Sequence, residues 1–309
     1  MPCYKPLTAW YSKDRNPSGK RSLVFTPNKA LESDDPLEIA CGQCIGCRLE
    51  RSRQWAVRCL HESSLYEDNC FITLTFAPEH LEARDNPWSL DVRDFQLFMK
   101  RLRKRFGSNI RFFHCGEYGE KYGRPHYHAC LFNFDFPDKT LWKIENDFRL
   151  YRSEILEELW PYGHSSIGSV TFESAAYVAR YIMKKITGEQ AEEHYKYVCK
   201  DTGEIFDLKP EYTTMSRRPG IGKQWFDKFS SDVYPDDFVV VNGKKVRPPK
   251  YYDRLLESMD PFVHDEIKQF RVEHGAEYNE NNTPQRLLVR EKIQLDRLKR
   301  LPRNVDGDI

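Results

Sequence analysis

Two strand-like segments joined by a glycine-rich stretch constrain the fold of this chain more than any other feature. Residues 110–115 and 126–134 are rich in β-branched and aromatic side chains, which favour strands. Between them, residues 116–125 contain three glycines and end in a proline, a composition typical of a turn. We therefore expect the two strands to pair through this turn.

The neighbouring segments extend the pattern. Residues 71–76 and 164–172 are expected to form strands, and residues 89–106, 139–160 and 173–187 are expected to form helices. This order predicts an α+β fold with a central, mainly antiparallel sheet and flanking helices. We expect irregular structure with short elements at 189–235 and mainly helices from residue 250 onward.

Length and composition suggest three regions. The 309 residues include 39% hydrophobic ones, enough to bury a substantial core. We expect a cysteine-rich N-terminal segment (1–64), a central domain (65–235) and a charged, mainly helical C-terminal region (236–309). The sequence shows neither a signal peptide nor a membrane-spanning run, so we expect a cytosolic location and no membrane partner. The net charge of +1 gives no general sign of nucleic-acid binding, although positive residues cluster locally.

A pair of histidines lies at the start of the second strand. Side chains alternate between the two faces of a strand, so His126 and His128 point the same way and can converge on one cation. Imidazole suits transition metals and tolerates Mg²⁺ or Mn²⁺ when oxygen ligands complete the shell. The expected third ligand is Glu117, which strand pairing draws toward His126, and Glu120 is the competing choice. The alternative is a half-exposed pair without any ligand role.

The helix expected at 173–187 carries two tyrosines one turn apart. Tyr177, Tyr181 and Lys184 fall on one side of an ideal helix, and an apolar stripe falls on the other. We therefore expect the helix to pack on the sheet without burying either tyrosine. Tyrosine is a poor nucleophile near neutral pH, but a neighbouring lysine favours its ionised form. Paired histidines and tyrosines together indicate an enzyme that cuts and rejoins single-stranded DNA.

These motifs occur together in a known class of proteins. The strand at 71–76, the histidine pair and the segment from Tyr177 through Tyr181 to Lys185 resemble, in order and spacing, the three motifs of the HUH class of rolling-circle replication endonucleases. Within that class, the chain is similar over roughly residues 1–230 to the replication initiation proteins of gokushoviruses, single-stranded DNA phages of the Microviridae. The segment beginning at Cys41 also looks typical of the phage group.

The resemblance implies both a fold and an activity. It implies a ferredoxin- or RRM-like sheet and a metal-dependent nickase that joins a tyrosine to the 5′ end of the cut strand, frees a 3′-OH and later rejoins the ends. The expected partners are single-stranded and origin-containing double-stranded DNA, in the host cell cytoplasm. A Walker-type motif is absent from the sequence, so unwinding is expected from a host helicase and synthesis from a host polymerase. The alternatives are a relaxase or transposase of the same class, or a zinc-containing nucleic-acid-binding protein without catalytic activity.

Three closely spaced cysteines suggest a second metal site. Cys41, Cys44 and Cys47 follow a Cys-x₂-Cys-x₂-Cys pattern, and a tetrahedral zinc site needs one more ligand. Cys3 is the first candidate, with Cys59 and His61 as alternatives. Similar spacings serve iron–sulfur clusters, but structural zinc is the favoured interpretation. The alternative is a turn of reduced thiols that packs by shape.

Basic residues outside these motifs are candidates for DNA contact. Arg217 and Arg218 belong to a glycine-rich basic loop beside a tryptophan, where arginines could hold phosphate and the aromatic ring could stack on bases. Lys185 follows the tyrosine motif, and Arg103 belongs to the basic cluster at 100–105. An ordinary surface loop is the alternative for residues 216–223.

Overall fold

The computed structural model describes residues 3–119, 123–145, 148–180, 190–199, 202–277 and 279–299. They divide into two compact units. The described residues of the first are 3–51 and 268–299, and the second is formed by residues 52–267. Helix α1 (Ile45–Ser63) and helix α9 (Pro261–Ala276) each contribute residues to both units.

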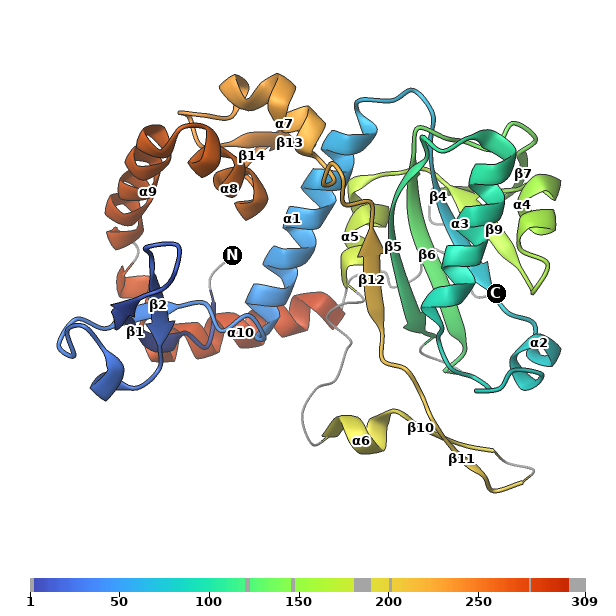
Figure 1. Cartoon of the computed structure of the whole chain (residues 1–309), viewed down its shortest axis with the longest axis horizontal. Helices are drawn as coiled ribbons and strands as arrows, with labels where there is room; N and C mark the ends of the chain where they lie inside the picture. Colours follow the sequence, from blue (N-terminus) through green and yellow to red (C-terminus); the bar gives the residue numbers. More distant parts are fainter. Residues whose placement is uncertain are drawn as a thin grey trace. The chain divides into compact units, whose positions relative to one another are not determined.

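A seven-stranded antiparallel sheet forms the centre of the second unit (Figure 1). The strand order is β12-β5-β6-β4-β9-β8-β7. The bounds of these strands are β4 (Asn69–Thr75), β5 (Arg111–Tyr118), β6 (Pro125–Phe132), β7 (Thr140–Glu145), β8 (Phe148–Arg152), β9 (Ser165–Gly168) and β12 (Tyr212–Met215). The expected α+β class, with an antiparallel sheet and flanking helices, is confirmed. The expected pairing of the glycine-linked strands is confirmed too, since β5 and β6 pair from Arg111↔Phe132 to Tyr118↔Pro125.

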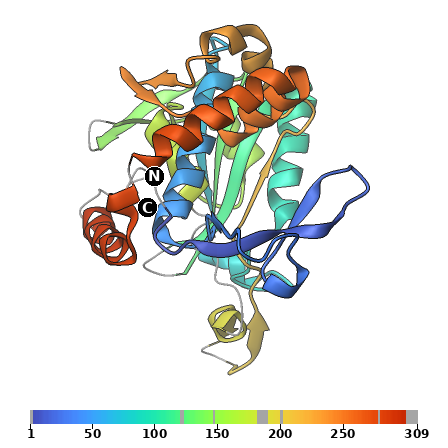
Figure 2. The same ribbon diagram turned by 90° about the vertical axis from the view of Figure 1, so that its left-hand side faces the viewer.

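Helices cover both faces of this sheet (Figures 1 and 2). Helix α3 (Val92–Phe106) and helix α4 (Glu154–Leu159) bury apolar side chains against one face, where Ile72, Leu74 and Leu131 project. Helix α5 (Phe172–Arg180) and the second half of α1 pack on the other face, against Phe71, Phe113 and similar residues. The central strand β4 is therefore buried almost throughout. A strand covered on both faces holds its side chains rigidly, which suits a strand that supports a site.

The helix expected at residues 139–160 was wrong over most of its length. Residues 140–145 and 148–152 form the strands β7 and β8, and among the described residues of this range only α4 is helical. The sequence Thr-Leu-Trp-Lys-Ile-Glu in β7 carries β-branched and aromatic residues that fit a pleated edge strand. The helix begins only after Ser153, whose side chain accepts a hydrogen bond from the Leu156 amide. Ser153 is thus the N-cap, and helical structure upstream of it is not favoured.

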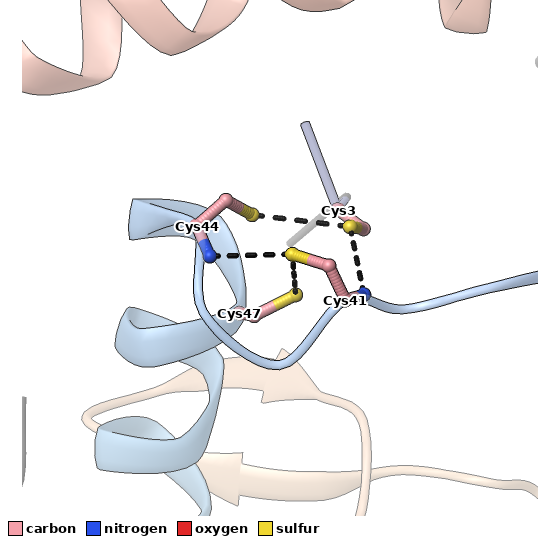
Figure 3. A group of neighbouring side chains, drawn as sticks. All are labelled: Cys3, Cys41, Cys44 and Cys47. Atoms are coloured by element: carbon pink, nitrogen blue, oxygen red, sulfur yellow. Dashed lines mark hydrogen bonds between the residues drawn. The ribbon is translucent and has the colours of Figure 1, made fainter. Parts of the chain in front are cut away.

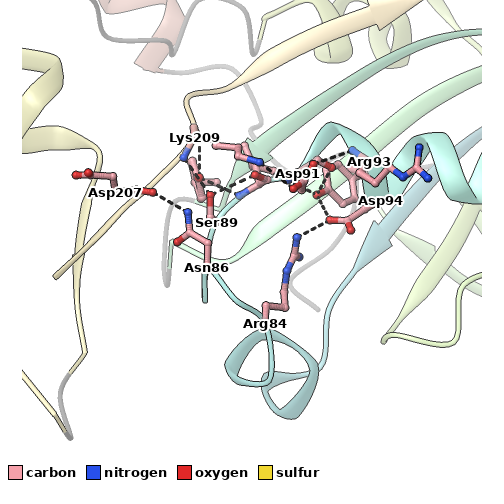
Figure 4. A network of polar contacts seen from close by, with 11 residues as sticks. Arg84, Asn86, Ser89, Asp91, Arg93, Asp94, Asp207 and Lys209 are labelled. Atoms are coloured by element: carbon pink, nitrogen blue, oxygen red, sulfur yellow. Dashed lines mark hydrogen bonds and ion pairs between the residues drawn. The ribbon is translucent and has the colours of Figure 1, made fainter. Parts of the chain in front are cut away.

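A network of polar contacts fixes the start of α3 (Figure 4). Asp91 caps the helix by accepting from the Arg93 amide at 2.9 Å, and its carboxylate pairs with Lys209 at 2.8 Å. Asp94 in the first turn pairs with Arg84 at 2.8 Å. The Lys209 amide donates to Ser89 at 3.0 Å. These contacts hold the segment that leads into β12 beside the loop that leads into α3.

The rest of the second unit consists of short elements and helices. These are α2 (Pro78–Glu82), α6 (Gln190–His194), β10 (Lys196–Val198), β11 (Ile205–Asp207), α7 (Lys223–Phe229), η3 (Ser230–Asp232), β13 (Val239–Val241), β14 (Lys244–Val246) and α8 (Lys250–Met259). The expectation of short elements at 189–235 is confirmed for its described part, with one addition. Strand β12 joins the edge of the main sheet beside β5.

The first unit contains a three-stranded antiparallel sheet, drawn in blue in Figure 2. Its strands are β1 (Leu7–Arg15), β2 (Arg21–Val24) and β3 (Leu37–Ile39), with η1 (Pro27–Lys29) between the last two. The weak periodicity of residues 1–40 gave no sign of this sheet. The short turn η4 (Asn279–Asn282) and helix α10 (Pro284–Lys299) complete the unit. The expectation of mainly helical structure from residue 250 onward is met in the described residues by α8, α9 and α10. Within the described ranges, no helix is long and apolar enough to cross a membrane.

Candidate metal and nucleophile site

Three of the predicted ligands converge at one end of the central sheet. The ligand atoms of Glu117, His126 and His128 all lie within 4.8 Å of one another. His128 Nε2 lies 2.8 Å from Glu117 Oε1, and both side chains are almost fully buried. His126 is half-buried, so the group opens toward solvent on its side. Two imidazoles and one carboxylate in this arrangement form a donor set suited to a divalent cation.

Strand register explains why these residues meet. Glu117 on β5 lies directly opposite His126 on β6, and His128 lies opposite Thr73 on β4. Directly opposed residues have their Cβ atoms about 5 Å apart and share a face of the sheet. Gly119 allows the chain to pass close to His126, since a Cβ there would lie 2.9 Å from the imidazole Cε1. The competing candidate Glu120 lies outside the described residues.

Thr73 is a member of the site that the sequence did not reveal. Its Oγ1 lies 3.1 Å from His128 Nδ1, in a fully buried position. When a metal occupies Nε2, Nδ1 keeps its proton and donates it to the threonine oxygen, which fixes the orientation of the ring. Thr73 is therefore a positioning residue for His128. The signal was available only in the pairing register of β4 and β6, which requires the fold.

The residue between the two histidines anchors their strand from the opposite face. Tyr127 is fully buried, and its hydroxyl donates to Asp94 at 2.6 Å and accepts from the Asp91 amide at 2.9 Å. Burial, together with the Asp94 carboxylate, raises the pKa of Tyr127 well above its ordinary value. This tyrosine is thus a structural anchor that holds β6 against α3, and it is not a nucleophile.

Tyr177 lies beside the histidines on α5. Its ring is 5.1 Å from the His128 ring in an edge-to-face arrangement, and it also contacts Phe71. The expectation that Tyr177 avoids the packed side of its helix was wrong, because the residue is only 9% exposed. Both the sheet and helix α1 pack against α5. Ser52 Oγ on α1 donates to the Ala176 carbonyl on α5 at 2.8 Å. Burial therefore extends around more of the helix than one apolar stripe.

Helix α5 begins at a reciprocal cap that fixes its position. The Ser174 amide donates to Thr171 Oγ1 at 3.2 Å, and the Thr171 amide donates to Ser174 Oγ at 2.8 Å. Such paired bonds satisfy free amides at a helix start. The other predicted catalytic residues, Tyr181 and Lys184, lie outside the described residues, as does Lys185.

Comparisons with known proteins bear on this site. A family model described as "Replication-associated protein ORF2/G2P" matches residues 69–186, a range that contains Glu117, both histidines and both tyrosines. The replication-associated protein VP4 of Bdellovibrio phage phiMH2K is 34% identical over 271 residues, covering 84% of this chain and 79% of that protein. The chain belongs to this family of phage replication-associated proteins.

Two further members of the family are similar. The replication-associated protein ORF2 of Spiroplasma virus 4 is 34% identical, covering 75% of this chain and 72% of that protein. The replication-associated protein ORF4 of Chlamydia phage 1 is 29% identical, covering 72% of this chain and 54% of that protein. A comparison with solved structures found no match.

The cysteine motif of this family member forms a compact group outside the range of the family model (Figure 3). The sulfur atoms of Cys3, Cys41, Cys44 and Cys47 all lie within 4.8 Å of one another. The Cys3–Cys44 and Cys41–Cys47 sulfur separations are 3.9 and 4.0 Å. Four thiolates around a tetrahedral zinc at about 2.3 Å would be about 3.8 Å apart, so the donor set fits that ion.

Backbone amides surround the sulfur atoms of this group. Cys41 Sγ accepts from the amides of Gln43 and Cys44, at 3.4 and 3.3 Å, and Cys44 Sγ accepts from the Tyr4 amide at 3.3 Å. Burial opposes ionisation of Cys44, but hydrogen bonds from the Cys47 and Tyr4 backbones outweigh it and lower the pKa to about 7. The competing fourth ligands lie elsewhere, since Cys59 is buried against the main sheet and His61 stacks on Trp225.

Three of the residues predicted to contact DNA line one cavity. Arg103, Arg217 and Arg218 all border a space of about 550 Å³ in the second unit. Arg217 and Arg218 are exposed. Arg103 is partly occupied, since its guanidinium donates to the Ile110 carbonyl at 2.7 Å. The expected contact with DNA therefore fits Arg217 and Arg218 better than Arg103.

Proposed function

We propose that this protein initiates rolling-circle replication of a small single-stranded DNA phage by nicking the origin strand with a tyrosine nucleophile and later rejoining the ends. The observation that carries the proposal is the placement of the Tyr177 ring 5.1 Å from the ring of His128, which belongs to the Glu117, His126 and His128 group. Family membership favours this role over that of a relaxase or transposase with the same chemistry. Residues 65–235 would form the nickase domain.

The ligand group suits Mg²⁺ or Mn²⁺. His126, His128 and Glu117 would hold the ion, leaving positions for oxygen atoms of the DNA. Bound there, a divalent cation polarises a phosphate and stabilises the charge that develops on it. Thr73 Oγ1 contacts His128 Nδ1 and would hold the ring in the orientation in which Nε2 can act as a ligand. The half-exposed His126 marks the side from which a DNA strand can approach.

The chain's own nucleophile would complete the reaction. The phenolic oxygen of Tyr177 or Tyr181 attacks the scissile phosphorus and loses its proton, while the bond from phosphorus to the 3′ oxygen breaks. The products are a 5′-phosphotyrosine and a free 3′-OH, which a host polymerase can extend. Lys184 would favour the phenolate. Two tyrosines allow one to hold a DNA end while the other attacks, so the later strand transfer closes a circle.

The proposed substrates are single-stranded DNA and origin-containing double-stranded DNA, with unwinding by a host helicase in the host cytoplasm. The four cysteines would hold a structural zinc ion. A non-catalytic, zinc-containing DNA-binding protein is the rival from a different class, and it would require neither tyrosine hydroxyl. The nicking test separates the two functions.

The test is covalent capture. The purified protein is incubated with single-stranded origin DNA and Mn²⁺, run on a denaturing gel, and mapped by mass spectrometry. We expect an adduct on Tyr177 or Tyr181 that disappears with EDTA. The Tyr177→Phe/Tyr181→Phe variant should bind DNA and form no adduct.

A matched control is Tyr151→Phe, which removes a hydroxyl from β8 while keeping the packed ring. It should form the adduct at the wild-type rate. Tight binding of DNA known to contain the origin, without any adduct, would contradict the nickase proposal and favour the binding protein.

A further inference from the structure

A cavity lined by arginines lies at the end of β5 that is farthest from the metal ligands. Residues 109–112, at the start of this strand, form part of its wall, whereas Glu117 lies near the other end of the strand. Arg111 and Glu117 are six positions apart, which corresponds to about 20 Å along a strand. Because both positions are odd-numbered, their side chains emerge on the same face of the sheet.

The charge of this cavity is of one sign. Its lining includes Arg103, Arg111, Arg217 and Arg218, together with Tyr66 and Asn109. Among the described residues that line it, none is an aspartate or glutamate. Arginine presents several donors in a planar fork that matches phosphate, and an aromatic wall suits a nucleobase. The chemistry therefore fits a phosphate-bearing ligand.

The loop that carries two of these arginines is held rigidly. The Ser216 amide donates to the Phe112 carbonyl at 3.0 Å, one residue beyond the paired part of β12, and the Phe112 amide donates to the Ser216 hydroxyl at 3.1 Å. Arg111 Nη2 donates to the Pro219 carbonyl at 2.8 Å, and the Gly222 amide donates to Glu62 at 2.7 Å. Both ends of the loop are thus tied to the sheet and to α1.

A buried ion pair between Glu62 and Arg111 holds that loop in place. Glu62 is fully buried and pairs with Arg111 through Oε1, while its Oε2 accepts from Gly222. Gly222 adopts a φ of 80°, and a Cβ there would lie 2.7 Å from the Tyr252 hydroxyl, so the turn requires glycine. The Arg111 guanidinium is already engaged by Glu62 and the Pro219 carbonyl. Arg217 and Arg218, which are exposed, remain to contact a ligand.

We propose that this cavity binds backbone phosphates of the DNA strand about 20 Å from the cleavage site. The inference rests on the proposed function, because the distance matters only if DNA is cut at the metal ligands. It deepens that function by adding a second site of contact with the DNA strand. At the rise of about 3.4 Å per nucleotide of a strand stacked as in B-form DNA, 20 Å spans about six nucleotides, and an unstacked single strand covers it with fewer. The cavity then fixes which stretch of the origin reaches the metal ligands.

The first experiment measures the salt dependence of binding to a single-stranded oligonucleotide by fluorescence anisotropy. Each phosphate contact on a single strand contributes about 0.7 to the slope of log K against log salt. The Arg217→Gln/Arg218→Gln variant should therefore lose about 1.4 from the slope, and ion release alone predicts about tenfold weaker binding at 0.15 M salt. The Lys244→Gln/Lys245→Gln variant removes equal charge from the β13–β14 hairpin and should keep the wild-type slope.

The second experiment tests the distance. Oligonucleotides are lengthened stepwise on each side of the nick. In the wild type, affinity should rise on one side only, within about six nucleotides of the nick, and this rise should be absent from the arginine variant. A wild-type salt slope in that variant overturns the proposal. So does arginine-dependent binding of inorganic phosphate without any change in the slope for DNA, because the site would then serve a free anion. Salt slopes need no cleavage, so they remain decisive even when no tyrosine adduct forms.

Discussion

Replacing Thr73 with valine isolates one hydrogen bond behind the candidate metal site. The two side chains are nearly isosteric, so the change removes the Oγ1 that lies 3.1 Å from His128 Nδ1 and leaves the packing of β4 in place. His128 then lacks the hydroxyl that contacts Nδ1 and holds the angle of its ring. Glu117 still lies 2.8 Å from Nε2, so the ligand group itself persists.

The expected loss of metal affinity follows from the role of such second contacts. Removing a partner of a metal-bound histidine typically weakens binding about 10- to 100-fold. That range corresponds to about 1.4–2.7 kcal/mol of binding free energy. Because His128 and Thr73 are both almost fully buried, water does not readily replace the lost contact, and we expect a value in the upper half of the range.

The measurement is Mn²⁺ titration by calorimetry, with the free energy of unfolding measured in parallel. Thr75→Val is the matched control, since Thr75 is on the same strand and face but donates to the His164 carbonyl at 3.0 Å. Both variants should lose about 1 kcal/mol of stability through a lost buried hydrogen bond. Only Thr73→Val should weaken Mn²⁺ binding, and unchanged or equally reduced affinity in the two variants would refute the positioning role.

Three other perturbations have defined outcomes. Cys44→Ser should abolish the binding of one zinc ion per chain, measured by elemental mass spectrometry, and lower the melting temperature, whereas Cys199→Ser should do neither. Burial lowers the pKa of His61 from 6.5 to about 3. The unfolded chain therefore takes up a proton that the folded protein excludes, so this contribution to stability is complete above pH 6.5 and is lost progressively toward pH 3. By urea denaturation, the stability lost by about pH 5.5 should be about 1.4 kcal/mol greater in the wild type than in His61→Gln, since the buried His114, whose pKa is also lowered, is present in both proteins. Tyr127→Phe, which leaves the Asp94 carboxylate without its 2.6 Å donor, should cost about 1.5–3 kcal/mol of unfolding free energy by chemical denaturation.

The part of the site predicted from the sequence is the part that strand geometry controls. Alternation along β6 placed both histidines on one face, and pairing through the glycine-rich turn brought Glu117 opposite His126. These inferences need only the period of a strand and a short connection between neighbours. A tetrahedral zinc site needs a fourth ligand beside the three closely spaced cysteines, and Cys3 was the first candidate for it. The structure brings the Cys3 sulfur to the other three.

The predictions that went wrong depended on tertiary neighbours. A helical wheel assumes one buried side, but α5 is covered by the sheet and by α1, so Tyr177 is buried. Residues 140–152 have a mixed pattern that also fits a helix, and only their place at the edge of the sheet makes them strands. Thr73 was missed because its role depends on the register between strands that lie far apart in the sequence.

Strand β5 links the two candidate functional regions of the second unit. Its odd-numbered side chains run from Arg111 at the cavity, through the buried Phe113 and Cys115, to Glu117 at the metal ligands. A one-residue shift in register would turn all of them to the opposite face. The even-numbered positions resist that shift. At Gly116 a Cβ would lie 2.8 Å from the Tyr212 ring, so residues with side chains are excluded there. The packing that fills the core thus also fixes the spacing between the arginines and the candidate metal ligands. Under the two proposals above, a DNA strand bound at the arginines would meet the candidate metal site at a set distance.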